Sequence, residues 1–176
     1  MTRTEALRAI ADFTGPVGPF QDPDERDRRE EAWAADVGAV EQILDLVIRP
    51  PTASELGRLA AEDFEYEISR ILTMIGARAP AAFIARVGPL LNDASARRTI
   101  IEVIGSLGLE EGLPWLNSLI EDRGLSEDDA VRLACALGEI GGRAARELLD
   151  RLEGATHPVR TRVLDEIGIA REAARR

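Results

Sequence analysis

Lysine is absent from this sequence, and all 22 basic residues are arginine. No lysine nucleophile or Schiff base can therefore form in the chain. Cysteine occurs once, at Cys135, so no disulfide can form within the chain, and we expect a reducing compartment. Aromatic residues make up 4% of the sequence although 45% of it is hydrophobic. A core must therefore be built from aliphatic residues, which suit packing between helices.

Long apolar runs and an excess of positive charge are also missing. No stretch reaches the roughly 18 uncharged apolar residues of a membrane span. The N-terminal residues are charged and amphipathic, without the apolar centre of a secretory signal, so we expect a cytoplasmic protein. The net charge is −10. An acidic chain repels phosphate backbones and anionic membranes, so neither a nucleic acid nor a membrane is the expected partner.

The negative charge is concentrated in the N-terminal part of the chain. Residues 1–67 contain 16 acidic and 7 basic side chains, whereas residues 68–176 contain 16 and 15. We therefore expect an acidic N-terminal surface, suited to a partner with a basic patch.

An apolar pattern ending in glycine recurs along the C-terminal two thirds of the chain. Three copies, 32 and then 33 residues apart, contain Leu72, Ile75 and Gly76; Ile104, Leu107 and Gly108; and Leu137, Ile140 and Gly141. A half copy follows with Leu164, Ile167 and Gly168. Spacings of three and four residues place each set on one face of a helix. The glycine after the first helix of each full unit suits a left-handed C-cap. The recurrence predicts stacked helical hairpins.

The sequence therefore predicts an all-α fold, an α-solenoid of antiparallel helix pairs. We expect helices over 64–75, 79–91, 94–107, 110–121, 127–140, 143–153 and 158–172. Residues 1–62 are expected to form an irregular helical cap, with a Gly- and Pro-rich linker at 14–23 and helices near 24–35 and 37–48. Residues 63–176 are expected to form one continuous repeat array, whose end units differ because one face meets water.

Helix start signals support these ranges. Thr2 with Glu5, and Thr52 with Glu55, have the spacing of a capping box, and so does Ser126 with Asp129 in place of glutamate. Asp93 can cap the helix that begins near residue 94.

These residues resemble a known family. The sequence Ala-Leu-Gly-Glu-Ile-Gly at 136–141, followed by Ala144, Ala145, Leu148 and Leu149, is similar to the short HEAT-like repeats named after phycobilisome lyases. Residues 103–108 (VIGSLG) and 165–168 (DEIG) are further matches, and the usual acidic residue after the second glycine is replaced by Gly142. The resemblance covers about residues 64–170. It implies a fold rather than a function, because such repeats occur in lyase subunits, enzyme accessory factors and adaptors.

The sequence offers few candidates for chemistry. His157, the only histidine, precedes Pro158 and has no evident partner, so we interpret it as a helix-start residue rather than a general base or a zinc ligand. Cys135 lies between two alanines in a predicted helix, where a small hydrophobic role is expected. No phosphate-binding glycine motif is present. We predict no catalytic residue, no metal and no cofactor.

Candidate binding residues come from the array surface. We expect the second helix of each pair to line the concave side, with exposed side chains recurring at equivalent positions. These are Arg78, Arg86, Asn117, Arg143, Asp150 and Arg151. Trp33, in the cap, is a further candidate anchor, because tryptophan is enriched at binding hot spots.

Three functions remain open at this point. The expected one is a non-enzymatic protein-binding module that uses its concave and acidic N-terminal surfaces. An accessory or lyase-like subunit that handles a prosthetic group rests on the family resemblance alone. Nucleic-acid binding would use arginines near the starts of the first helices, such as Arg97, Arg132 and Arg162. The negative net charge of the chain argues against this function.

Overall fold

The chain is helical throughout the part that the structure describes. This computed structural model describes residues 2–13, 23–57, 59–122, 125–156 and 160–175. In those ranges helices and turns occur but no strand, so the predicted all-α class is confirmed. The helices group into two compact units, residues 1–78 (unit 1) and 79–176 (unit 2).

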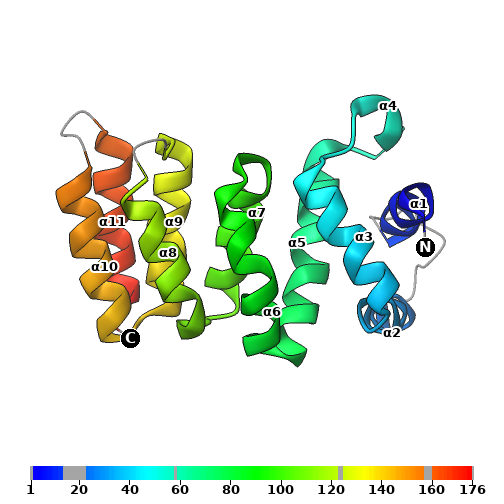
Figure 1. The fold of residues 1–176 in the computed structure, drawn as a ribbon, viewed down its shortest axis with the longest axis horizontal. Helices are drawn as coiled ribbons and strands as arrows, with labels where there is room; N and C mark the ends of the chain where they lie inside the picture. The colour runs from blue at the N-terminus through cyan, green and yellow to red at the C-terminus, as the bar shows by residue number, and fades with distance from the viewer. Residues whose placement is uncertain (1, 14–22, 58, 123–124, 157–159, 176) are drawn as a thin grey trace. The chain divides into compact units, whose positions relative to one another are not determined.

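The described part of unit 1 contains α1 (Arg3–Phe13), α2 (Pro23–Ala34), α3 (Val37–Ile48), α4 (Ala53–Leu56) and α5 (Ala61–Arg78) (Figure 1). Its core is mainly aliphatic, as the composition indicates, and includes Ile10 of α1, Ile43 and Leu46 of α3, and Ile68 and Ile71 of α5, with Phe64 the aromatic residue among its described members. The predicted capping box of α4 is present: the Thr52 hydroxyl accepts from the Glu55 amide, and the Glu55 carboxylate accepts from the Thr52 amide.

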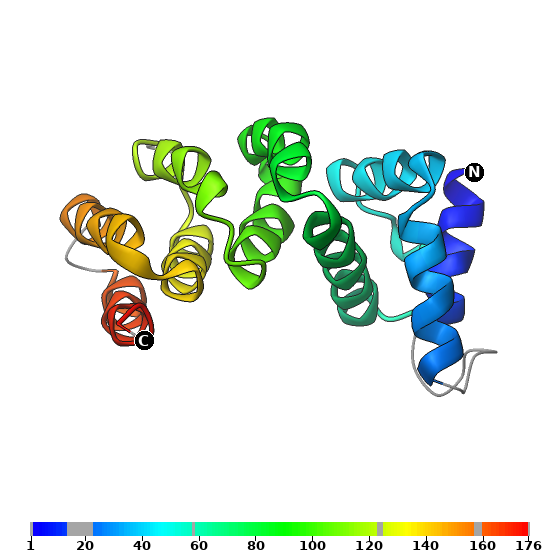
Figure 2. The same ribbon diagram turned by 90° about the horizontal axis from the view of Figure 1, so that it is seen from below.

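Unit 2 contains α6 (Pro80–Val87), the 3-10 turn η1 (Gly88–Asn92), α7 (Ala94–Ser106), the turn η2 (Glu110–Gly112), α8 (Leu113–Ile120), α9 (Glu127–Ile140), α10 (Gly142–Ala155) and α11 (Thr161–Ala173). Its helices fall into two layers, with α7, α9 and α11 in one and α6, α8 and α10 in the other (Figure 2). Asp93 and Ser126 cap α7 and α9 as predicted, each accepting from a backbone amide two or three residues ahead.

Two glycines allow the helices of the layer formed by α7, α9 and α11, here called the first layer, to approach closely. A Cβ atom at Gly105 of α7 would lie 2.7 Å from the Cα atom of Ala136 on α9. A Cβ atom at Gly138 of α9 would lie 2.9 Å from the Cα atom of Ala170 on α11. Real side chains do not approach a backbone this closely, so only glycine fits at these two crossings.

The glycines that end the predicted repeats have two different roles. Gly108 and Gly141 have φ angles of +61° and +68°, as expected of C-cap glycines. The same prediction is wrong for Gly76, whereas the predicted helix over 158–172 already ran through Gly168. Gly76 is buried within α5, which continues to Arg78, and Gly168 lies within α11. A glycine in the helical conformation keeps its backbone hydrogen bonds, so it does not by itself end a helix.

Most predicted helix ranges are confirmed to within a few residues, and the range 127–140 is reproduced in full. The predicted helices at 79–91 and 110–121 are each divided between an α-helix and a 3-10 turn. The expected division of the chain at residue 62 differs from the unit boundary, since α5 groups with the N-terminal helices. Whether α5 opens the repeat array therefore stays a prediction. None of the described helices combines the length and the apolar run that a bilayer crossing requires.

Candidate functional site

Two of the predicted binding residues meet on the α8–α10 side of unit 2. The Arg151 guanidinium on α10 donates to the Asn117 side-chain oxygen on α8, and it donates to Glu121 at 2.7 Å. These bonds join neighbouring second helices at a half-exposed surface. A polar network between α8 and α10 is thus built into the predicted face.

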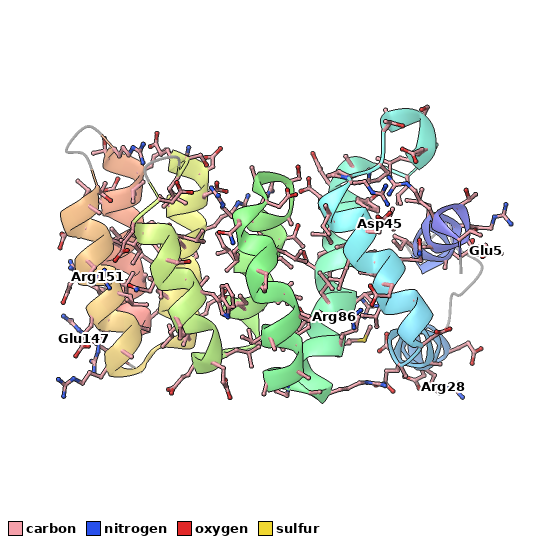
Figure 3. The ribbon with its side chains drawn as sticks, in the orientation of Figure 1. Glu5, Arg28, Asp45, Arg86, Glu147 and Arg151 are labelled. Atoms are coloured by element: carbon pink, nitrogen blue, oxygen red, sulfur yellow. The ribbon has the colours of Figure 1, made fainter. Side chains whose placement is uncertain are left out.

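Two others take part in different contacts. Asp150 accepts a hydrogen bond of 2.5 Å from Arg171 of α11, which also reaches Glu153. Arg143 donates to Glu147 one turn ahead at 2.8 Å, and this hydrogen bond raises the pKa of Arg143. Arg151 and Glu147 both extend from α10 (Figure 3). Asp150 therefore connects α10 to α11, and it is Arg151 that meets Asn117.

The remaining candidates lie apart from that network. Arg86 is exposed on α6 (Figure 3). Arg78 is exposed at the end of α5, in unit 1. Trp33 belongs to α2, but its side chain lies outside the described residues, as does all of His157. The role of all these residues in binding stays a prediction.

A second polar surface, missed by the sequence reasoning, runs across α7, α9 and α11. Arg132 of α9 forms an ion pair with Glu102 of α7. Arg162 of α11 forms an ion pair of 3.1 Å with Asp128 of α9. Cys135 of α9 donates its thiol hydrogen to Glu166 of α11 at 3.1 Å. The signal available in the sequence was the recurrence, every 30 to 34 residues, of polar groups that could pair.

The chemistry of Cys135 is opposite to that of a nucleophile. Burial and the adjacent Glu166 carboxylate raise the pKa of the Cys135 thiol to about 11. Reactive cysteines have lowered pKa values, because the thiolate is the attacking species. Burial also raises the pKa of Glu139, one helical turn further along α9. Within the described ranges, no three His, Cys, Asp or Glu side chains converge as a metal site.

Unit 1 exposes an aromatic side chain within an acidic segment. Tyr66 on α5 is 67% exposed, the highest value among large hydrophobic side chains of the described residues. Glu62, Asp63 and Glu65 on the same helix are also exposed. An exposed tyrosine offers an apolar ring and a polar hydroxyl, a combination common at protein interfaces.

Unit 1 also has a groove of about 290 Å³ between α1 and α4, lined by Thr4, Leu7, Arg8, Ala11, Glu55, Leu56 and Leu59. It is at the small end of the range of ligand pockets and is open to solvent. We assign no ligand to this groove.

No protein-family model, no curated protein and no solved structure matches this chain. The resemblance to HEAT-like repeats therefore stays a prediction, as do the accessory-subunit and nucleic-acid alternatives.

Proposed function

We propose that this chain is a non-catalytic protein-binding module that recognises a partner with a basic surface. The observation that carries the proposal is the exposed Tyr66 beside exposed carboxylates on α5. A partner arginine or lysine could contact the ring face of Tyr66 and pair with Glu62 at once. The charge of the N-terminal part, residues 1–67, would steer such a partner toward unit 1.

We further propose that unit 2 is an α-solenoid of HEAT-like pairs. The support is that its helices lie in two layers, that α7, α9 and α11 pack side by side in one, and that α8 and α10 pack side by side in the other. Packing of α9 on α7 and α11 is more extensive than that of α10 on α8. A two-layer array curves toward its more closely spaced layer, so α7, α9 and α11 would form the inner face. This assignment reverses the expectation that the second helices are concave.

The binding proposal can be tested by capture followed by kinetics. The immobilised full-length protein is incubated with a lysate of its source organism at low and high salt, and retained proteins are identified by mass spectrometry. A recovered basic protein is then produced separately, and its association rate is measured. We expect this rate to fall steeply as salt rises, because electrostatic steering is screened.

Matched variants make the test specific. Tyr66→Ala should speed dissociation, and Glu62→Gln should slow association. Glu147→Gln, which removes one negative charge from α10 of unit 2, serves as the control and should change neither rate. If no protein is retained at low salt, or if Tyr66→Ala and Glu147→Gln behave alike, the proposal is wrong.

A further inference from the structure

Three glycines occupy equivalent places in the first layer of unit 2. Each directly follows a fully buried aliphatic residue, in the pairs Ile104–Gly105, Leu137–Gly138 and Ile167–Gly168. A second buried residue precedes each pair by four positions: Ile100, Leu133 and Val163, respectively. The pairs belong to α7, α9 and α11, so Gly168 of α11 corresponds to the two glycines at the close crossings.

At two crossings, Gly105 of α7 and Gly138 of α9, a neighbouring helix packs on the glycine; we call these the filled crossings, and both have the same construction. Gly105 faces Ala136, and the residue three before the glycine, Glu102, pairs with the residue four before the alanine, Arg132. The next crossing repeats the arrangement: Gly138 faces Ala170, Cys135 lies three residues before the glycine, and Glu166 lies four before the alanine and accepts the thiol hydrogen of Cys135. A small residue and a polar partner four positions earlier therefore define the helix that docks on each glycine.

The third glycine faces open space in the described structure. A Cβ atom at Gly168 would meet no atom within 4 Å. Leu164 is half-buried, whereas Ile101 and Ala134, at the equivalent positions of α7 and α9, are fully buried. Ile169, beside Gly168, is 62% exposed. The residue three positions before Gly168 is Asp165, which is exposed.

We propose that Leu164, Asp165, Gly168 and Ile169 form a docking face, the α11 face, for a helix of a partner protein. By the geometry of the filled crossings, that helix carries alanine or glycine opposite Gly168. Because Asp165 is acidic, it carries arginine or lysine four residues before the small residue. Arg132 and Ala136 show this pattern where α9 docks on Glu102 and Gly105 of α7.

Charge argues against a second copy of α11 as the occupant. In an antiparallel pair with a twofold axis at Gly168, Asp165 would oppose Arg171 of the other copy, and Leu164 would oppose Glu172. Arg171 already donates to Asp150 and Glu153 of α10, so Asp165 would lack a free basic partner and each Leu164 would meet a carboxylate. A helix with a free basic residue opposite Asp165 supplies that partner. The α11 face is in unit 2 and does not depend on Tyr66, so it can be tested separately from the proposed function.

The probe is a fluorescent, cross-linked helical peptide with the sequence of residues 127–142 and serine in place of Cys135. A cross-link on the face away from Arg132 and Ala136 is needed because short isolated helices are marginally stable. Binding to the full-length protein is measured by fluorescence anisotropy. We expect saturable binding that Gly168→Leu and Asp165→Arg each weaken by about tenfold or more, through a steric clash and charge repulsion respectively.

Controls separate the face from general effects. Gly154→Leu changes another exposed helical glycine with nothing within 4 Å and should leave binding unchanged. Gly168→Leu should fold, because leucine favours helix more than glycine does. A peptide with Arg132→Glu should bind the wild type poorly and regain affinity for the Asp165→Arg protein. Tyr66→Ala should have no effect on peptide binding.

Three results would each overturn the proposal. The first is no saturable binding of the peptide. The second is equal binding to the Gly168→Leu and Gly154→Leu proteins, or failure of the exchanged charge pair to restore affinity. The third is self-association of the protein, seen in sedimentation, that Gly168→Leu abolishes, since this would assign the face to a second copy.

Discussion

Glycine residues of unit 2 differ in what lies opposite them, although several share the same helical conformation. Gly105 lies against the backbone of α9, whereas Gly154 on α10 faces open space. Alanine is favoured over glycine in a helix by about 1 kcal/mol. A methyl group forced into a close helix crossing costs roughly 1–3 kcal/mol. The sign of a Gly→Ala substitution therefore depends on the neighbour and not on the helix.

We predict opposite effects for two alanine substitutions. Gly105→Ala should lower the free energy of unfolding, because the new methyl group would lie 2.7 Å from the Ala136 Cα atom. Gly154→Ala should raise it by up to about 1 kcal/mol. Urea unfolding followed by circular dichroism measures both. Equal stabilisation by the two substitutions would mean that α7 and α9 are not in close contact.

The Cys135 thiol should react slowly with a disulfide reagent. Its pKa of about 11 leaves little thiolate at pH 8, and the Glu166 carboxylate contributes to that value. Replacing this carboxylate by Glu166→Gln should lower the thiol pKa and increase the rate, which absorbance stopped-flow measures across pH. A rate as high as that of an unfolded control would contradict the contact between α9 and α11.

Between elements, one buried arginine joins three segments of unit 2. Arg97 of α7 is 8% exposed and donates to the Leu91 backbone oxygen at 2.9 Å, at the end of η1. It also forms ion pairs with Asp122 at 3.1 Å and with Asp129 on α9 at 3.7 Å. The next residue, Arg98, is exposed and lies 3.9 Å from Glu102 of its own helix. Adjacent residues of the same type therefore have very different surroundings.

This difference predicts unequal effects of alanine at the two positions. Arg97→Ala should cost about 3 kcal/mol, because it leaves the buried Leu91 carbonyl and the half-buried Asp129 carboxylate without their donor. Arg98→Ala should cost less than about 1 kcal/mol, as is typical of exposed pairs. Chemical denaturation of the two variants gives the comparison. Similar midpoints for both would show that Arg97 does not connect η1 and α9.

In unit 1 an arginine and a capping box depend on each other. Arg3 of α1 donates to Glu55 at 2.9 Å, to Asp45 of α3 at 3.2 Å and to the Arg49 backbone oxygen at 2.8 Å. Its hydrogen bond, with those from Thr52, lowers the pKa of Glu55 from 4.5 to about 2. The ionised Glu55 carboxylate therefore stabilises the contact among α1, α3 and α4.

The lowered pKa predicts a direction for acid unfolding. The contribution of Glu55 is fully present above pH 4.5, its ordinary value, and is lost as the pH falls toward 2. Glu55→Gln should reduce stability at neutral pH and remove this part of the acid dependence. Thermal unfolding between pH 2 and 7 tests it, with Glu62→Gln, outside the network, as a control. Parallel curves for the wild type and Glu55→Gln would contradict the pairing with Arg3.

At the scale of the molecule, the two units differ in charge and in packing. The acidic excess belongs to residues 1–67, and the repeated helix crossings belong to unit 2. Within unit 2, α9 packs against α7, α10 and α11, whereas α11 packs against α9 and α10. The local stability of a helix is set by the contacts that it makes with its neighbours.

We therefore expect hydrogen exchange within unit 2 to be slowest at the amides of α9. Opening α9 disrupts contacts with two helices of its layer and one of the other, so it requires more free energy than opening α11. Mass spectrometry of exchanged peptides distinguishes the two helices. Faster exchange in α9 than in α11 would contradict the packing.

The sequence by itself determined the all-helical class, the aliphatic core and the beginnings of several helices. Thr52, Asp93 and Ser126 were predicted as caps and act as caps, because a cap bonds to amides two or three residues ahead. The range of α9 was predicted for the same reason, since helical periodicity is a local property of the chain.

Only the tertiary structure decided which residues of different helices meet. Gly108 follows the end of α7 with a positive φ angle, whereas Gly168 lies within α11, although similar sequences precede both glycines. Arg151 reaches Asn117, and Arg132 reaches Glu102, through the rotation and spacing of packed helices. Those two quantities depend on side-chain volumes at each crossing, such as Gly105 against Ala136, and are not encoded in the spacing along one helix.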